Sequence, residues 1–145
     1  MKPITTFLWF DDNAEEAADY YVSLFPDSRI TQVKRYPQAS EKVSGKPAGS
    51  VMLVDFELNG MPFTALNGGE IAGFTFSPAT SFVLKCEDQA EIDRYWAALS
   101  AVPEAEQCGW CTDKFGITWQ VVPTILFELL NDPTKTEKAP PHFCP

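Results

Sequence analysis

The chain has 145 residues and a net charge of −9 at pH 7, and 45% of its residues are hydrophobic. This length favours one domain with a real core, and the composition excludes a disordered chain. The acidic surplus argues against nucleic acid as a partner, and no apolar run approaches the ~20 residues that span a membrane. The first residues lead into a strand-like segment without a signal peptide, so a cytoplasmic location is expected.

The first half of the chain reads as a strand, a helix and three further strands. Asn13 and Glu16 have the spacing of a capping box, and apolar residues then recur at helical spacing. The pair Asn59-Gly60 predicts a hairpin turn between the last two strands. The expected strands are residues 4–10, 29–36, 50–58 and 61–66, and residues 38–49 are expected to form a loop.

The same pattern recurs 75 residues further on. A strand at 80–84 precedes a second capping box, Asp88 and Glu91, and another amphipathic helix. Strands are expected near 104–112 and 117–122, joined by a turn at 113–116. The positions that correspond between the halves are Phe7 and Phe82, Glu16 and Glu91, Tyr20 and Tyr95, Tyr21 and Trp96, and Leu24 and Leu99.

The repeat predicts two β-α-β-β-β units, at about 1–70 and 78–133, within a single domain that covers residues 1–133. Residues 134–145 are expected to form an irregular tail, because their three prolines prevent a regular helix.

Paired units with an aromatic doublet late in each helix resemble the vicinal oxygen chelate superfamily, which includes glyoxalases, extradiol dioxygenases and bleomycin-resistance proteins. Within it, the chain is similar to the PhnB-like family, often labelled 3-demethylubiquinone-9 3-methyltransferase. The resemblance implies an α+β fold with a curved mixed sheet around a pocket, and a homodimer. It covers residues 4–133 and depends on the motifs at 7–11, 65–69, 107–110, 113–116 and 119–123.

Metal-dependent members of the superfamily carry ligands on the opening and closing strands of each unit. The resemblance transfers these positions to Thr6 and Ser81 on the opening strands and to Thr64 and Gln120 on the closing strands. Neutral hydroxyl and amide oxygens hold a divalent cation weakly, so no metal and no cofactor is expected.

The same four side chains either face a wet cavity or hydrogen-bond an organic ligand. Leu8 and Phe10 share the strand face of Thr6 by alternation and could form a wall of such a pocket. Asn67 either closes the pocket or is a turn residue with positive φ. The predicted ligand-binding residues are Thr6, Leu8, Phe10, Thr64, Asn67, Ser81 and Gln120.

Cys108 and Cys111 form a CxxC motif, which in redox proteins begins a helix. Here the motif falls in a strand-turn region, which disfavours redox chemistry. A zinc site of Cys108, Cys111, His142 and Cys144 has acceptable ligand types but an unusual spacing. In a cytoplasmic chain all four cysteines are expected to be thiols, and Cys86 is expected to be buried.

Three functions follow from these observations. The first is a small-organic-molecule binding protein or a metal-independent enzyme, and neither a substrate nor a catalytic residue is identified. The second is a methyltransferase of quinone metabolism, as the family label implies, although the chain lacks a GxGxG loop and an alternating β-α pattern. The third is a zinc- or thiol-based regulator that uses the CxxC.

Overall fold

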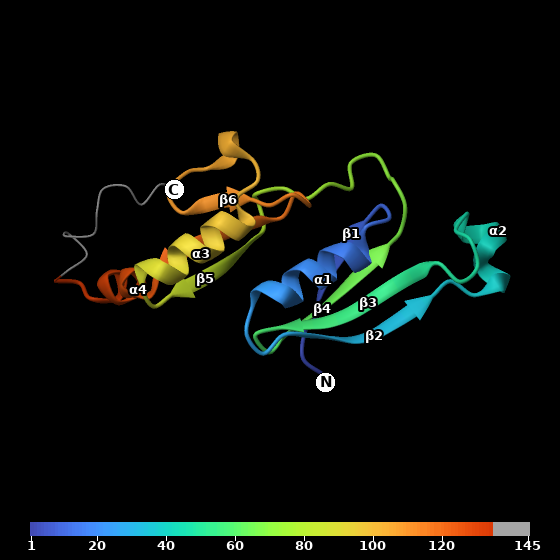
Figure 1. Ribbon diagram of the computed structural model, residues 1–145, viewed down its shortest axis with the longest axis horizontal. Coiled ribbons are helices and arrows are strands. Elements are labelled where there is room, and N and C mark those ends of the chain that lie inside the picture. Colours follow the sequence, from blue (N-terminus) through green and yellow to red (C-terminus); the bar gives the residue numbers. More distant parts are fainter. Residues whose placement is uncertain (135–145) are drawn as a thin grey trace. The chain divides into compact units, whose positions relative to one another are not determined.

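Residues 1–134 are described by a computed structural model, in which two units each build their own β-sheet (Figure 1). The first unit is Met1–Phe74 and the second begins at Thr75. The fold is α+β, with two mixed sheets and four α-helices in the described residues.

The first unit contains the predicted β-α-β-β-β order. Its sheet has the strand order β1-β4-β3-β2, in which β1 runs parallel to β4 and the other pairs are antiparallel. The expected loop at 38–49 contains two short helical turns. The elements are β1 (Thr6–Phe10), α1 (Ala14–Leu24), β2 (Arg29–Arg35), η1 (Gln38–Ser40), α2 (Glu41–Ser44), β3 (Val51–Leu58) and β4 (Met61–Asn67).

One face of this sheet packs against α1, which lies along it in Figure 1. Phe56 and Phe63 pair across β3 and β4, and their rings stack with centroids 5.2 Å apart. Ala17 and Ala18 are fully buried on α1, because small side chains let a helix approach a sheet closely. The core of this unit therefore lies between α1 and the sheet.

The turn between β3 and β4 is the predicted two-residue hairpin. Asn59 and Gly60 both adopt positive φ, 48° and 80°. This backbone twist matches the twist of paired strands, and asparagine and glycine adopt it at low cost.

The N-terminus of α1 is capped from a distance, and the capping box predicted there is wrong. The Asn13 side chain makes no capping hydrogen bond. Instead, Ala14 donates its backbone N–H to Oδ1 of Asn67 over 2.8 Å. Phe10 and Asn67 are paired at the ends of two parallel strands, so the Asn67 amide reaches the helix start directly.

The second unit has three strands, as expected from the ranges 80–84, 104–112 and 117–122, which is one fewer than the predicted β-α-β-β-β repeat contains. Its sheet has the order β5-β7-β6, with β5 parallel to β7 and β6 antiparallel to β7. The strand expected near 104–112 is shorter, because a 3-10 turn that begins at Pro103 precedes it. The elements are β5 (Ser81–Cys86), α3 (Gln89–Leu99), η2 (Pro103–Ala105), β6 (Trp110–Thr112), β7 (Thr118–Pro123) and α4 (Thr124–Asn131), and α4 was not predicted.

The start of α3 has the predicted capping arrangement. Glu91 donates its backbone N–H to Oδ1 of Asp88 over 2.9 Å, and Oε2 of Glu91 accepts from the backbone N–H of Glu87 over 2.8 Å. The return bond reaches one residue further back than a capping box requires, and it still satisfies an exposed donor before the helix.

The core of the second unit lies between α3 and the sheet. Trp119 is buried, its ring lies 5.3 Å from that of Phe82, and its cross-strand partner Cys111 is fully buried. Leu99 of α3 is also fully buried. The prediction that Trp119 belongs to the layer beneath the helix is therefore confirmed.

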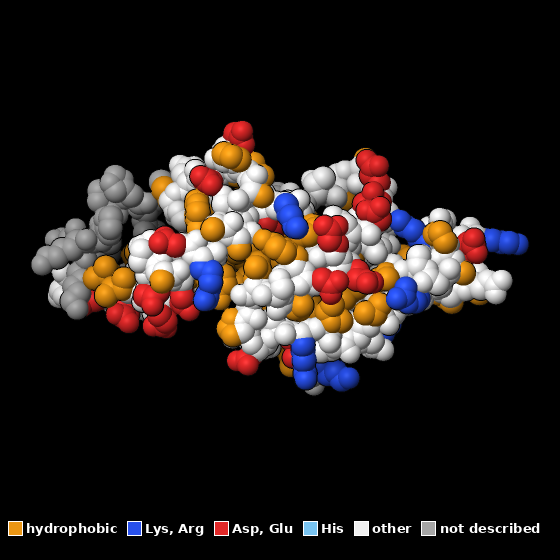
Figure 2. Space-filling view, in the orientation of Figure 1, with side chains coloured by type: hydrophobic (Ala, Val, Ile, Leu, Met, Phe, Trp, Pro, Cys, Tyr) orange, Lys and Arg blue, Asp and Glu red, His pale blue; other side chains and the backbone are white. Residues whose placement is uncertain are grey.

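Acidic side chains are dispersed over the face shown in Figure 2, as the net charge of −9 requires. Within residues 1–134, no helix has both the length and the apolar character needed to cross a membrane.

Candidate functional site

The face of the second sheet that points away from α3 carries polar side chains. Strand pairing sets them in two cross-strand rows. Thr112, Thr118 and Ser81 form one row, and Trp110, Gln120 and Val83 form the next. Opposed side chains on paired strands lie about 5 Å apart, so these residues make one continuous surface.

Two of the predicted site residues meet on this face. Gln120 donates its side-chain N–H to the Ser81 hydroxyl over 2.9 Å. Both side chains are half-buried. The sheet register therefore brings together residues that are 39 positions apart in the sequence.

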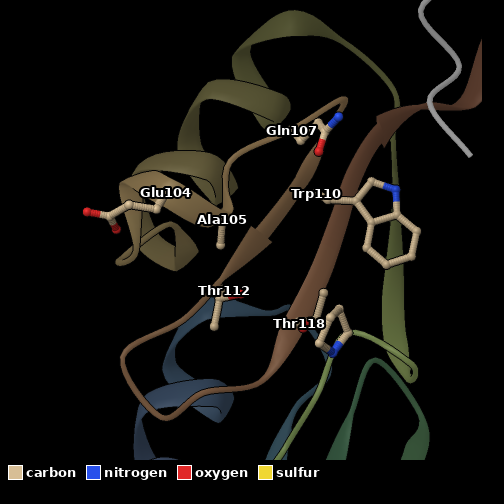
Figure 3. A pocket seen from close by; sticks show the side chains of 7 residues that line it. Glu104, Ala105, Gln107, Trp110, Thr112 and Thr118 are labelled. Carbon is tan, nitrogen blue, oxygen red and sulfur yellow. The ribbon is translucent and has the colours of Figure 1, made fainter.

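A cavity of about 310 Å³ lies beside these rows (Figure 3). Its lining includes the apolar residues Trp110 and Ala105 and the two threonines Thr112 and Thr118. Figure 3 shows the Glu104 carboxylate pointing away from the other labelled side chains. The described residues that line the cavity are Pro78, Glu104, Ala105, Gln107, Trp110, Thr112 and Thr118.

Thr118 has an unusual environment in this cavity. The residue is 3% exposed, and its Oγ1 has no hydrogen-bond partner among the described residues. A buried hydroxyl without a partner costs about 1–3 kcal/mol.

Trp110, Thr112 and Thr118 were not among the predicted site residues. Side chains alternate between the two faces of a strand, so Thr118, two positions before Gln120 on β7, shares its face. The sequence alone could therefore have identified Thr118. The pairing of Trp110 and Thr112 with this face depends on the position of a three-residue strand, which no local pattern marks.

In the first unit, Thr64 lies on the sheet face away from α1. Its hydroxyl donates to Oδ1 of Asp55 over 2.6 Å, and Asp55 also pairs with Lys34 at 3.6 Å. Thr6 pairs with Phe63 and therefore lies on the opposite face from Thr64. The sheet does not bring these two predicted site residues together.

Leu8 and Phe10 share the face of Thr6, as predicted, and this face is the one that α1 covers. They are 7% and 4% exposed. Both side chains belong to the core beneath the helix, beside Ala65 and Asn67 of β4.

Asn67 ends β4 and makes three interactions. Besides capping α1, it donates from Nδ2 to the Val51 carbonyl over 3.1 Å, and its own carbonyl accepts from the Tyr36 hydroxyl over 2.6 Å. It is not a turn residue with positive φ. It also lines a second cavity, of about 350 Å³, together with Asp12, Glu15, Lys46, Pro47, Ser50 and Val51.

A family model described as 3-demethylubiquinone-9 3-methyltransferase matches residues 2–122. The chain belongs to this family. A PhnB protein from Bacillus cereus, whose name carries the same description, has a solved structure that is 34% identical, with a TM-score of 0.67 over 83% of this chain and 99% of that one. No curated protein matches the chain.

Two more distant structures share the fold of this PhnB-like chain. One is a protein from Pseudomonas aeruginosa, with 20% identity and a TM-score of 0.59 over 85% of this chain and 97% of its own. The other is a gene product of Arabidopsis thaliana, with 21% identity and a TM-score of 0.53 over 85% of this chain and 98% of its own.

The metal positions that the resemblance implied do not fit a divalent cation in this PhnB-like chain. Ser81 and Gln120 are neutral donors that bond to one another, and Thr64 is paired with Asp55. Within residues 1–134, no three His, Cys, Asp or Glu side chains are grouped as a metal site requires. The proposed zinc ligands His142 and Cys144 lie outside the described residues.

The CxxC motif of this family member runs from a tight turn into β6, in the strand-turn region that was predicted. Cys108 and Gly109 both have positive φ, and Trp110 donates its backbone N–H to the Gln107 carbonyl over 2.7 Å. Cys111 is a fully buried free thiol. Burial, with smaller contributions from Asp113 and Glu106, raises its pKa to about 11. A reactive redox cysteine needs the opposite shift.

Cys86 is also a buried free thiol, as predicted. Its pKa is raised, mainly by burial and then by the charge of Glu91. The prediction of thiols is therefore confirmed for Cys86 and Cys111, and it is wrong for Cys108, which is disulfide-bonded.

Proposed function

We propose that this PhnB-like chain binds a small organic molecule in the cavity of its second unit. The observation that carries the proposal is the lining of this cavity, in which Trp110 and Ala105 supply apolar surface beside the polar residues Thr112 and Gln107. Small-molecule sites usually combine apolar walls with a few polar groups that orient the ligand, and this lining has that composition.

Ser81 and Gln120 support the site from the same sheet face. Their mutual hydrogen bond fixes the side chain of Gln120 next to Trp110. The residues predicted in the first unit, Thr6, Leu8, Phe10, Thr64 and Asn67, carry no part of this proposal.

Binding is better supported than acid-base catalysis. Among the described residues, the side chains that face the cavity are hydroxyl, amide, indole and aliphatic groups, and none of these titrates near neutral pH. A general acid or base would need such a group within hydrogen-bond reach of the ligand. The Glu104 carboxylate points away (Figure 3).

A cavity-filling variant tests the proposal. Native mass spectrometry of the purified protein, before and after incubation with a fragment library, should detect bound organic molecules. Ala105→Phe should abolish this binding, because Ala105 lines the cavity. Ala97→Phe, at an exposed position on α3, is the matched control and should bind as the wild type does. Equal binding by Ala105→Phe would place the ligand elsewhere.

A second candidate function is methyl transfer to a quinone, and the name of the matching family favours it. Isothermal titration with S-adenosylmethionine tests it directly. Saturable binding of this methyl donor, followed by transfer to a demethylated quinone, would support the family name. If S-adenosylmethionine does not bind at millimolar concentration, this chain lacks the methyl-transfer activity that the family name describes.

We also propose that the chain forms a homodimer, as its resemblance to dimeric proteins implies. Exposed apolar side chains such as Phe7 and Val83, which are 57% and 41% exposed, support the idea that further surface is buried on association. Light scattering at micromolar concentration should give twice the monomer mass, and a monomer mass would refute the proposal.

A further inference from the structure

For the cavity of about 350 Å³ in the first unit, we propose a second ligand, a small zwitterion that carries an ammonium and a carboxylate group, as free amino acids do. The proposal goes beyond the function proposed above, because it concerns another cavity and another class of ligand. It depends on two half-buried side chains of opposite charge, Glu15 and Lys46, which line this cavity without pairing with one another.

Local structure brings the Lys46 side chain to the cavity. Gly45 adopts a φ of 68° and donates its backbone N–H to the Glu41 carbonyl over 3.0 Å, which ends α2 in a left-handed cap. Lys46 comes next and is half-buried, although Gly45 and Pro47 on either side are exposed. Its Nζ donates to the Asp11 carbonyl over 3.3 Å, so a backbone group holds the ammonium at the cavity.

Gly69 leaves the room that this lysine occupies. A Cβ on Gly69 would lie 3.4 Å from both Cε and Nζ of Lys46, so the end of the side chain packs against the glycine backbone. The same Asp11 carbonyl that binds Nζ also accepts from the Gly69 N–H over 3.1 Å. The ammonium therefore lies where the segment after β1 meets the segment after β4.

Glu15 supplies the opposite charge from the first turn of α1. The start of this helix is fixed, because Ala14 donates its N–H to Asn67, which is 7% exposed and lines the same cavity. Glu15 is half-buried, whereas Glu16, the next residue, is exposed. Asp12 adds a second carboxylate to the lining, but it is exposed, so water screens its charge.

The charged groups of the lining have no counter-charge of their own. None of the ion pairs within residues 1–134 includes Lys46, Glu15 or Asp12. A half-buried charge loses part of its hydration, and without a partner this loss is not offset. A zwitterion offsets it at both groups, because its ammonium bonds to Glu15 and its carboxylate to Lys46. Charge-assisted hydrogen bonds of this kind are about twice as strong as neutral ones.

A ligand with a single charge fits this lining less well. An anion would pair with Lys46 and be repelled by Glu15 and Asp12. A cation would pair with the two carboxylates and be repelled by Lys46, whose bond to the Asp11 carbonyl keeps it at the cavity. Only a ligand with both charges is attracted by every charged group of the described lining.

The uncharged residues of the lining indicate the body of the ligand. Pro47 and Val51 are apolar, and Ser50 and Asn67 are polar. The volume of about 350 Å³ lies near the lower end of the ~300–1,000 Å³ range of small-molecule pockets. An amino acid with a short aliphatic side chain suits this combination of size and lining.

Three probes separate the two charges in isothermal titrations at low ionic strength, where screening is weakest. L-Leucine carries both groups, 3-methylbutylamine is leucine without its carboxylate, and 4-methylpentanoate is leucine without its ammonium. We expect saturable binding of L-leucine, with each of the other two weaker by roughly tenfold or more, as the loss of one charge-assisted hydrogen bond requires. Failure of L-leucine to bind, or equal or tighter binding of either single-charge probe, would overturn the proposal.

Two substitutions assign the charges to their residues. Lys46→Met should weaken the binding of L-leucine by roughly tenfold and leave 3-methylbutylamine bound at least as tightly as before. Glu15→Gln should weaken L-leucine to a similar extent and leave 4-methylpentanoate bound at least as tightly as before. Neither substitution removes an ion pair, so both variants should unfold at the urea concentration of the wild type.

Matched controls remove the same charges at exposed positions nearby. Lys42→Met on α2 and Glu16→Gln on α1 do not alter the lining and should bind L-leucine as the wild type does. Unchanged L-leucine binding in either cavity variant would overturn the proposal. An equal loss in the controls would also overturn it, because the effect would then come from the net charge of the chain and not from this cavity.

Discussion

Trp119 donates its indole N–H to Oδ2 of Asp113 over 2.8 Å, and both side chains are buried. The other carboxylate oxygen of Asp113 accepts from the backbone N–H groups of Phe115 and Ile117, at 2.8 and 3.0 Å. One carboxylate thus joins the turn before β7 to a core residue of that strand. The neighbouring residue on the strand, Gln120, lies on the opposite face, beside the cavity.

Trp119→Ala should therefore lower the free energy of unfolding by about 3–5 kcal/mol, because it leaves a large cavity beneath α3. It also removes the indole N–H that donates to Oδ2 of the buried Asp113. Urea unfolding followed by circular dichroism measures the effect. Gln120→Leu is the control on the opposite face and should change stability by about 1 kcal/mol or less, since it loses one half-buried hydrogen bond to Ser81. The reverse ranking would contradict the assignment of the two faces.

Asn67→Ala should destabilise the first unit by about 1–2 kcal/mol, because it removes the cap of α1. It also removes the donor to the Val51 carbonyl. Asn67→Asp keeps an acceptor for the Ala14 N–H and loses only that donor, so it should retain part of the stability. In thermal unfolding, the melting temperature should fall in the order wild type, Asn67→Asp, Asn67→Ala. If Asp and Ala are equally destabilised, the helix cap contributes nothing measurable.

Gly68→Ala should be destabilising by about 1–3 kcal/mol, because a Cβ at this position would overlap the six-membered ring of Trp9. The indole of Trp9 is held there by its hydrogen bond to the Gly69 carbonyl, 2.9 Å, and by an edge contact with Phe74. The near-ultraviolet circular dichroism of Trp9 should change as well.

The variant Trp9→Phe tests whether Gly68→Ala is destabilising because of the clash with Trp9 or because of the change from glycine to alanine itself. The smaller ring makes room for the new methyl group, so Gly68→Ala should cost less in the Trp9→Phe background. Equal costs in the two backgrounds would show that Trp9 is not what excludes a side chain at this position.

Cys111 should react slowly with thiol reagents in the folded protein. Its pKa is raised from the ordinary value of 9.0 to about 11, so at pH 8 its thiolate population falls by roughly 100-fold. Iodoacetamide labelling followed by peptide mapping should show Cys111 unmodified in native protein and modified in urea. Rapid labelling of Cys111 in the native protein would instead support the hypothesis of a thiol-based regulator.

The same shift makes the contribution of Cys111 to stability depend on pH. Burial favours the neutral thiol, so the folded state holds its proton more tightly than the unfolded state. The contribution is complete below pH 9.0 and is lost as the pH rises through about 11. The difference in unfolding free energy between wild type and Cys111→Ala should narrow across this range, and a constant difference would contradict the shift.

Local patterns determined much of this protein. The alternation of apolar residues and the Asn59-Gly60 turn predicted β3 and β4 to within a residue, and the Asp88–Glu91 spacing predicted the start of α3. These features depend on residues that are neighbours in the sequence, so their physical cause is present in the sequence itself. The orientation of Trp119 and Gln120 follows from alternation for the same reason.

Only the tertiary structure decided which distant side chains meet. Asn67 replaces the local cap of α1 because strand pairing carries its amide to the start of that helix. Thr6 and Thr64 lie on opposite faces because the register of β1 against β4 opposes Thr6 to Phe63. Thr118 lies between Thr112 and Ser81 because β7 pairs with β6 on one side and with β5 on the other. The register of paired strands is a property of the assembled sheet, and no local pattern specifies it.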